Sequence, residues 1–327
     1  MRWRNAFSPR KVLNALKIEG GTLAIAARHG FPDRMPQFLG GLGDELLLTC
    51  VARELKKRQA GLKIWQVSAA AELLAGNPDY HRVFSMRDWE LRYSNLLNRR
   101  RVKLRYSEMT EEGERETPVN RHILAELCVR AGIAGEIELR PWYVQTGEER
   151  TRGRVAARQA AVHSGGAASH PNVMNNKLWY HERYQEVVDR LRETDPGLTL
   201  VQLGALADPP LRGVLDLRGR TGLRESAAVL SESEWFLGTS GLLSHLARAV
   251  ECRSVVVYGG REHAWQTGYP CNENLETSLP CAPCWRWNRC ERGRECMRLI
   301  GVERVLAAVE SLQARKSLPL EVQMATV

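Results

Sequence analysis

The sequence predicts an α/β protein built from two successive parallel-sheet domains. Its 327 residues, 43% of them hydrophobic, are too many for one ordinary domain and suit two. Apolar runs of strand length alternate with amphipathic segments of helix length in both halves, and this β-α-β rhythm is typical of parallel sheets. Glycine-rich loops follow the strand ends, where open α/β sheets bind ligands. We therefore expect a ligand in a cleft between the domains.

The first half is organised around the glycine-rich stretch that ends at Asp44. A helix is expected behind it, because apolar residues recur at helical spacing as far as Leu55 and cations fill the last turn before Gly61. The glycines let the backbone turn sharply and leave room for a ligand, so Asp44 is a candidate base. The alternative is that Asp44 only caps the helix.

The other elements of this half are less distinctive. Residues 1–34 are predicted to form an extension, whose helix from Pro9 to about Ile18 is broken by Gly20-Gly21. The basic run 99–105 is interpreted as a solvated helix face, with a docking edge for a phosphorylated acceptor or an anionic membrane as the alternative. The remaining expected elements are a strand ending at 38–39, a strand at 62–67, a helix at 69–75, a strand at 83–84, a helix at 117–131 and a strand at 137–139.

The second half repeats the rhythm after a charged segment, 148–154, which we take as the interdomain linker. Its first strand leads into a small-residue loop, His163 to Ser169, which suits phosphate binding or is a plain surface turn. The predicted elements are strands at 155–162, 199–203, 214–217, 235–237 and 254–258, and helices at 181–192, 223–230, 242–249 and 302–313.

Charge and cysteine usage restrict the function further. A formal charge of +9 makes an anionic ligand, an acidic surface or nucleic acid plausible as a partner. The polar N-terminus and the absence of a ~20-residue apolar run predict a soluble cytoplasmic protein. Eight cysteines in such a protein indicate thiols or metal ligands.

Four of the cysteines, Cys281, Cys284, Cys290 and Cys296, cluster in sixteen residues and begin with a Cys-x-x-Cys pair. This spacing favours a structural zinc or iron site, with free thiols in a compact loop as the alternative. Cys271 is a possible spare ligand. The other three, Cys50, Cys128 and Cys252, are expected to be small core residues.

Six motifs in order resemble the heptosyltransferase family of glycosyltransferases over about residues 38–310. They are Gly41-Leu42-Gly43-Asp44, Gly76-Asn77-Pro78-Asp79, His163-Ser164-Gly165, Asn176-Lys177-Leu178-Trp179, Asp216 to Thr221, and Ser240-Gly241 with the helix to Ala247. One departure concerns the last motif, because Thr239 and Ser240 stand where the family carries an acidic residue.

The resemblance implies a GT-B fold, in which two Rossmann-like domains with parallel sheets face a central cleft. Residues 35–150 would be the acceptor-side domain, 151–301 the donor-binding domain, and 302–327 a C-terminal helix and tail, with the helix crossing back to the first domain. The implied reaction is inverting transfer of a sugar, expected to be a heptose from ADP-heptose, to a lipopolysaccharide, glycan or protein acceptor. Similar cysteine motifs, iron-bound, occur in family members that modify autotransporter proteins.

The implied chemistry gives each candidate residue a role. Asp44 would take the proton of the acceptor hydroxyl. Lys177 and His245 would supply charge or hydrogen bonds to the diphosphate, although a solvated lysine and a core histidine are the alternatives. The other expected donor-binding residues are Ser164, Gly165, Gly166, Thr221, Ser240 and Gly241. No Asp-x-Asp motif is present to hold Mg²⁺, so none is expected to be required.

Two other classes of function are compatible with the sequence. A degenerate transferase could keep the fold as a binding protein and use the cysteine loop, residues 271–296, to bind a partner. The departure at Thr239-Ser240 favours this alternative, and the presence of Asp44 and Lys177 argues against it. A nucleic-acid binder would need basic residues on one face with exposed aromatics, for which Trp285 and Trp287 between arginines are the one hint.

Overall fold

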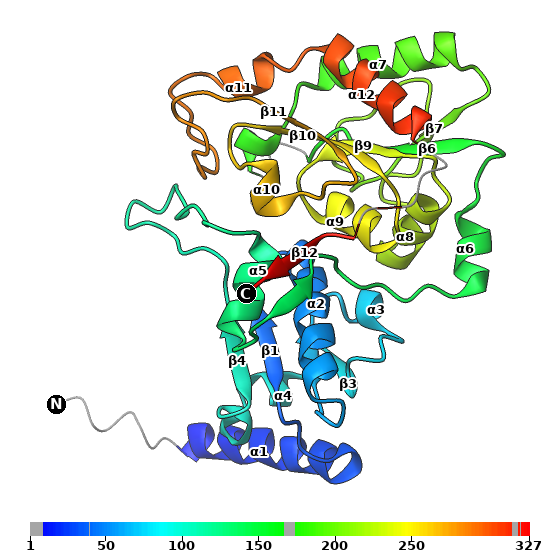
Figure 1. Cartoon of the computed structure of the whole chain (residues 1–327). Helices are drawn as coiled ribbons and strands as arrows, with labels where there is room; N and C mark the ends of the chain where they lie inside the picture. The colour runs from blue at the N-terminus through cyan, green and yellow to red at the C-terminus, as the bar shows by residue number, and fades with distance from the viewer. Residues whose placement is uncertain (1–8, 39, 167–173, 316–319, 321) are drawn as a thin grey trace.

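The computed structural model describes residues 9–38, 40–166, 174–315, 320 and 322–327, and it has the two-part α/β architecture expected (Figure 1). The elements of the first part are α1 (Pro9–His29), β1 (Met35–Phe38), α2 (Leu42–Arg58), β2 (Trp65–Ser68), α3 (Ala71–Leu74), β3 (Arg82–Ser85), α4 (Trp89–Tyr93), η1 (Asn95–Leu97), β4 (Arg101–Leu104), α5 (Ile123–Arg130) and β5 (Glu136–Glu138). Those of the second are α6 (Gly147–Gly153), β6 (Gln159–Val162), η2 (Asn175–Lys177), α7 (His181–Thr194), β7 (Thr199–Gln202), β8 (Leu215–Asp216), α8 (Leu223–Ser231), β9 (Phe236–Thr239), α9 (Leu242–Ala249), β10 (Ser254–Gly259), α10 (Ala264–Thr267), β11 (Glu273–Glu276), α11 (Glu295–Arg298), α12 (Val302–Ala314) and β12 (Met324–Thr326).

The second part contains one six-stranded sheet in the order β11-β10-β9-β6-β7-β8, and all of its strand pairs are parallel. The chain runs outward from β6 to β8 and then returns to β9 on the other side of β6. This reversal places a switch point between β6 and β9, and ligands of open α/β sheets bind at the carboxyl ends of the strands beside such a point.

The first part has parallel pairs β1-β4 and β2-β3, joined by a single parallel bridge between Arg34 and Ile64. Helix α2 packs against β1, α5 and, in the second part, α9. Figure 1 shows α9 and α10 of the upper part facing α2 and α5 of the lower part. The carboxyl end of β1 therefore points towards the second part of the chain.

The prediction that Gly20-Gly21 ends the first helix is wrong, because α1 continues to His29. Thr22 and Ala26 are buried in this continuation. At Gly21 a side chain would lie 2.7 Å from Cγ of Glu90, so the glycine allows α4 to pack closely against the helix. Tertiary packing thus outweighs the low helix propensity of glycine here.

The basic run 99–105 is also misassigned, because its centre is the strand β4 and not a helix face. Leu104 is buried beside Phe38 in register with β1. The guanidinium of Arg100 donates to the carbonyl of Pro32, and that of Arg101 donates to the carbonyl of Leu91. These two arginines therefore tie the strand to its neighbours instead of forming a docking edge.

Two further predictions about connections are corrected. The charged segment taken as a linker forms helix α6, capped by Thr146, whose hydroxyl accepts from the N–H of Glu149. Gly153 is the last residue of α6 and contacts the backbone of Ala228, so a side chain would not fit there.

The last helix, α12, does not cross back to the first domain: its buried face, which includes Val305, packs on α7 and β10. The tail after it returns instead, and β12 pairs antiparallel with β5.

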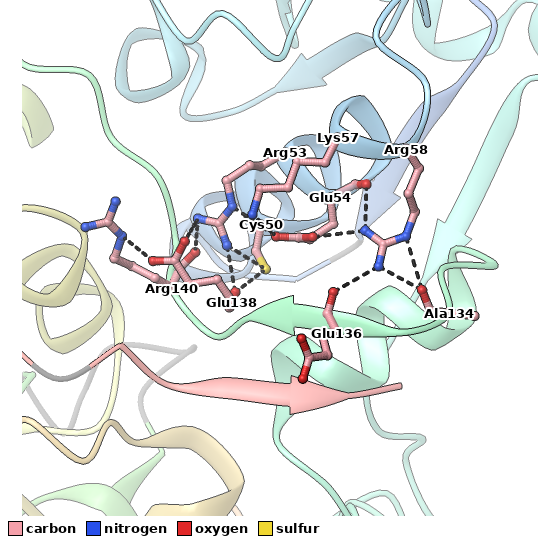
Figure 2. Close-up of polar contacts among 9 residues, drawn as sticks. All are labelled: Cys50, Arg53, Glu54, Lys57, Arg58, Ala134, Glu136, Glu138 and Arg140. Atoms are coloured by element: carbon pink, nitrogen blue, oxygen red, sulfur yellow. Dashed lines mark hydrogen bonds and ion pairs between the residues drawn. The ribbon is translucent and has the colours of Figure 1, made fainter.

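A polar cluster fastens β5 to α2 (Figure 2). The buried carboxylate of Glu54 accepts from Lys57 at 2.9 Å and from Arg58 at 3.0 Å, and it also pairs with Arg53. Arg53 reaches across to the carbonyl oxygens of Glu138 at 2.6 Å and Arg140 at 2.9 Å. One carboxylate thus pairs with three cations, and two of these, Arg53 and Arg58, also bind the backbone of the segment around β5.

Throughout the described part of the chain, no helix combines the length and the apolar character needed to cross a bilayer.

Candidate active site

Asp44 lies on the first turn of α2, just beyond the carboxyl end of β1. Its Oδ2 accepts a hydrogen bond from the N–H of Gly41 at 2.8 Å, and its Oδ1 accepts one from the Tyr106 hydroxyl at 3.0 Å. At Gly40 a side chain would collide with Oδ2 of Asp44 and with the ring of Phe38. Glycine at position 40 therefore lets the carboxylate fold back over the helix N-terminus, where the helix dipole favours a negative charge.

The expected cap is present, but it engages only part of this carboxylate. Each carboxylate oxygen can accept two hydrogen bonds, so one lone pair on each oxygen stays available to an acceptor hydroxyl. Burial raises the pKa of Asp44, while hydrogen bonds from Gly41 and Tyr106 and the charge of Lys177 lower it. The capping and base roles are therefore compatible in one side chain.

The effect of Lys177 on Asp44 links the two parts of the chain. Lys177 ends the short helix η2 in the second part, and its Nζ lies 3.1 Å from Oε2 of Glu262. Glu262 follows the carboxyl end of β10 and is 2% exposed. Burial opposes its ionisation, but the charges of Lys177 and Arg261 lower its pKa to about 2. At the junction between the domains, the Lys177 ammonium is therefore close enough to Asp44 to lower the pKa of its carboxyl group.

A chain of ion pairs continues from Glu262 into the first domain. The guanidinium of Arg261, 2% exposed at its side chain, lies 2.7 Å from Oε2 of Glu262 and 2.7 Å from Oε2 of Glu116. The Thr267 hydroxyl adds a hydrogen bond to Glu262 at 3.1 Å. Buried charges of this kind are stable only when they are paired and hydrogen-bonded, as these are. The network fixes Lys177 relative to the hairpin that carries Glu116.

His245 is close to this network and is neutral, which leaves the hydrogen bond of the two contributions expected from it. It lies in the first turns of α9, and its Nδ1 is 2.8 Å from the Tyr269 hydroxyl. Burial and the nearby charge of Lys177 lower its pKa to about 3, so the imidazole is neutral near pH 7. The histidine can therefore offer a hydrogen bond through Nε2 but no positive charge.

The two glycine-rich loops meet at this junction. Ser240 and Gly241 follow β9 directly and open helix α9. At Gly43 a side chain would lie 3.4 Å from Cα of Leu242, so the N-terminal turns of α2 and α9 approach closely. Backbone N–H groups at a helix N-terminus bind anions. The start of α9, which follows Gly241, thus lies close to Gly43, the residue before Asp44.

The remaining predicted donor-binding residues make contacts within the second domain, and none of these contacts reaches Asp44. The Ser164 hydroxyl donates to the carbonyl of Pro209 at 2.7 Å and accepts from Gln202, so it organises its own loop. Gly165 has φ of +89° beside Leu178, a conformation that favours glycine, and Gly166 follows it. The rest of this small-residue loop, 167–169, lies outside the described residues. Thr221 lies beyond the outermost strand β8, and its hydroxyl bonds to Ser226 at 2.9 Å.

The cysteine loop gathers thiols beside the second domain. Cys281 is exposed, and Cys284, Cys290 and Cys296 are half-buried. Burial raises the pKa of Cys284 and of Cys296, and neighbouring thiols raise both further. Yet the described residues contain no group of three or more His, Cys, Asp or Glu side chains placed to hold a metal ion. The thiols thus lie near enough to one another for their charges to interact.

The other cysteines behave as small core residues. Cys50, Cys128 and Cys252 are buried, as predicted. Cys271, the possible spare ligand, is also buried, and its thiol lies 3.5 Å from Oδ1 of Asn272. No disulfide joins any of the eight cysteines, all of which the structure describes.

Sequence reasoning missed the partners that hold Asp44 and Lys177. Arg261 and Glu262 come two and three residues after β10, and Tyr106 comes two residues after β4. Both positions lie at carboxyl ends of parallel strands, where open α/β sheets bind ligands, so this rule could have found them. Tyr106 was missed because its strand was interpreted as a helix face.

Comparison with known proteins agrees with this arrangement. Residues 148–291 match the family model described as glycosyltransferase family 9 (heptosyltransferase). No curated protein sequence matches the chain. The matched residues contain Lys177, Gly241 and Glu262 but not Asp44.

Solved structures share the fold of nearly the whole chain. The dodecameric iron-containing heptosyltransferase TibC of enterotoxigenic Escherichia coli, solved with ADP-D-β-D-heptose, aligns with a TM-score of 0.65 and 17% identity over 88% of this chain and 78% of TibC. The E. coli ADP-heptose lipopolysaccharide heptosyltransferase II gives 0.63 and 14% over 86% and 99%. A family 9 glycosyltransferase from Veillonella parvula gives 0.61 and 13% over 86% and 97%.

These likenesses establish a GT-B fold with two Rossmann-like domains. The family model that matches residues 148–291 is that of the heptosyltransferases, the same family that the motifs resemble, and the solved structures share its fold.

Proposed function

We propose that this protein transfers a heptose from ADP-heptose to a glycan, lipopolysaccharide or protein acceptor. The observation that carries the proposal is that the N-terminal turn of α2, which holds Asp44, packs against the start of α9 in the second domain. The charge of Lys177, also of the second domain, lowers the pKa of Asp44 there. A base and a phosphate-binding cation on opposite sides of an interdomain junction suit transfer from a nucleotide-diphospho-sugar.

The proposed reaction is a single displacement. Asp44 takes the proton of the acceptor hydroxyl while that oxygen bonds to the anomeric carbon of the donor. The bond from this carbon to the diphosphate breaks, and its electron pair leaves with the nucleotide. Because the acceptor attacks opposite the leaving group, the anomeric configuration inverts.

The second domain would stabilise the departing diphosphate. Lys177 supplies charge, and the N–H groups at the start of α9, beginning with Gly241, supply oriented donors. We place the donor against these groups and against Ser240 and the Gly165-Gly166 turn, with a neutral His245 as a hydrogen-bond partner. In this scheme Lys177 provides the positive charge that Mg²⁺ supplies in other transferases. Ser164 and Thr221 would shape the loops around the donor.

The alternatives lose support from the positions of particular side chains. Trp285, half of the hint for a nucleic-acid binder, is only 1% exposed and cannot stack on a base. A degenerate binding protein would not need the two hydrogen bonds that fix Asp44. The degenerate-protein alternative drew on Thr239 and Ser240, which replace the acidic residue of the family motif. The second domain nevertheless has a buried carboxylate, that of Glu262, next to Lys177. We therefore favour an active enzyme, which we place in the cytoplasm.

A transfer assay tests the proposal and separates the classes of acceptor. Heptose-labelled ADP-heptose is incubated with the protein and with rough lipopolysaccharide or an unmodified autotransporter protein. Incorporation of the labelled heptose into one of the acceptors supports the reaction and identifies the class of acceptor. Intact donor with both acceptors, under conditions where a known heptosyltransferase is active, would contradict it.

We also propose that the cysteine loop holds a structural zinc or iron ion, because its four thiols are the soft ligands that these metals prefer. Cys281, Cys284, Cys290 and Cys296 would bind the ion, which would stabilise the loop. Metal analysis of protein purified without added metal is expected to find about one equivalent of zinc or iron, and a Cys284→Ser/Cys290→Ser variant is expected to lose it. Less than a tenth of an equivalent in the unaltered protein would count against the site.

A further inference from the structure

The Tyr106 hydroxyl makes a direct contact with the proposed base. It donates to Oδ1 of Asp44 at 3.0 Å. Burial and the negative charge of Asp44 raise the pKa of Tyr106 well above its usual value, so the hydroxyl remains protonated and keeps donating. The carboxylate is thus held at both oxygens, by Tyr106 on one and by the N–H of Gly41 on the other.

Two aromatic rings hold Tyr106 in this position. Phe38, from the end of β1, packs against it with ring centroids 5.2 Å apart and planes tilted by 31°. Trp285, from the cysteine loop of the second domain, meets it edge-on with centroids 6.4 Å apart. Trp285 is itself fixed by a hydrogen bond from Nε1 to Gln266 and by the guanidinium of Arg261 over its ring.

The cysteine loop is anchored to the first domain by its backbone as well. The hairpin of residues 109–116 pairs with the loop through an antiparallel bridge between Arg115 and Arg286. The N–H of Glu116 donates to the carbonyl of Trp285, and the N–H of Trp287 donates to the carbonyl of Glu114, each at 3.0 Å. Trp285 belongs to the same hydrophobic core as residues of α2 and α5.

We propose that the cysteine loop completes the base site, with Trp285 holding Tyr106 against Asp44 so that Tyr106 positions the carboxylate for proton transfer. This inference rests on the proposed function, because it takes Asp44 as the base. It gives the cysteine loop a role in the reaction that does not depend on whether the loop holds a metal.

The charged groups around Asp44 set the direction of the expected pH effect. Lys177 of η2 lowers its pKa, Glu116 of the hairpin raises it, and Glu45 is the adjoining acid on α2. The hydrogen bond from Tyr106 lowers the pKa because it favours the ionised carboxylate. Removing this donor should therefore make the base protonate at higher pH.

The test uses Tyr106→Phe, which keeps both ring contacts and removes only the hydroxyl. We expect kcat to fall by about tenfold and the acid limb of the kcat–pH profile to move up by about one pH unit, as loss of one hydrogen bond to a charged group implies. Calorimetry should show an unchanged Kd for ADP-heptose. The matched control is Tyr184→Phe, since Tyr184 is a buried phenol whose hydroxyl has no partner among the described residues.

Trp285→Phe tests whether the cysteine loop contributes to the base site. It should shift the same acid limb upward, whereas Trp235→Phe, which alters an equally buried tryptophan of the second domain, should not. An unshifted limb in Tyr106→Phe or in Trp285→Phe, or a loss of ADP-heptose binding in Tyr106→Phe, would overturn the inference. Normal turnover of Asp44→Asn would instead overturn the proposed base, so the two failures are distinguishable.

Discussion

Replacement of Asp44 by Asn is expected to lower kcat for heptose transfer by about 10²–10⁴-fold, the usual contribution of a general base. The amide has the shape of the carboxylate but cannot accept a proton from the acceptor hydroxyl. Its oxygen can still accept from the N–H of Gly41, and its NH₂ group can turn to the Tyr106 oxygen. The variant should therefore fold normally and bind ADP-heptose with the affinity of the unaltered protein.

The matched control for this variant is Glu45→Gln, which removes the next carboxylate along α2. Glu45 is buried and accepts from Gln66 at 3.2 Å, in the interior of the first domain. Its loss should leave kcat within a few-fold of normal. Near-normal kcat in Asp44→Asn would remove Asp44 from the mechanism, and equal losses in both variants would mean that the effect is one of folding.

Glu54→Gln is expected to lower the free energy of unfolding by about 3 kcal/mol at pH 7, because it removes the carboxylate that pairs with Arg53, Lys57 and Arg58 in a buried ion cluster. Glu54 is 1% exposed at its side chain, and Arg53, which stays behind, is 7% exposed. Lys57 and Arg58 are partly exposed, so their share of the loss is smaller. Figure 2 shows that the same arginines hold the segment around β5, which should loosen as well.

The pH dependence of this loss has a definite sign. Burial opposes ionisation of Glu54, but hydrogen bonds from Lys57 and Arg58 lower its folded pKa below the ordinary value of 4.5. The stabilisation is therefore fully present above about pH 4.5, the value expected in the unfolded chain, and disappears as the pH falls through the folded pKa. Urea unfolding of both proteins as a function of pH measures this difference.

Glu148→Gln is the control for this measurement, because Glu148 forms an exposed pair with Arg152 in which both side chains are more than half exposed. We expect it to change the free energy of unfolding by at most about 0.5 kcal/mol. If Glu54→Gln were as mild as this control, the buried cluster would not be what holds β5 to α2.

The sequence predicted most of the parallel-sheet elements and the glycine-rich loops at some strand ends, because these depend on local pattern. The helical spacing of apolar residues such as Leu47 and Leu55 indicated α2. The glycine-rich loops that follow predicted strands drew attention to Asp44 and Gly241. The path of α1 through Gly21 could not be predicted, because it depends on the close approach of Glu90 in α4.

The electrostatics of the site depend on burial, which one sequence does not reveal. His245 was expected to offer charge or a hydrogen bond, and burial beside Lys177 keeps it neutral near pH 7, so only the hydrogen bond is left. The pairing of Lys177 with Glu262 joins residues 85 positions apart, and the contact of Trp285 with Tyr106 joins the two domains. Such contacts follow from how the domains meet, and no local motif contains them.

The most direct test of a nucleotide-sugar transferase is calorimetric titration of the unaltered protein with ADP-heptose, and with a GDP-sugar and a UDP-sugar for comparison. It requires no knowledge of the acceptor. We predict saturable binding of ADP-heptose at one site per chain, and weaker or no binding of the other two. Absence of binding to all three sugars would contradict the account.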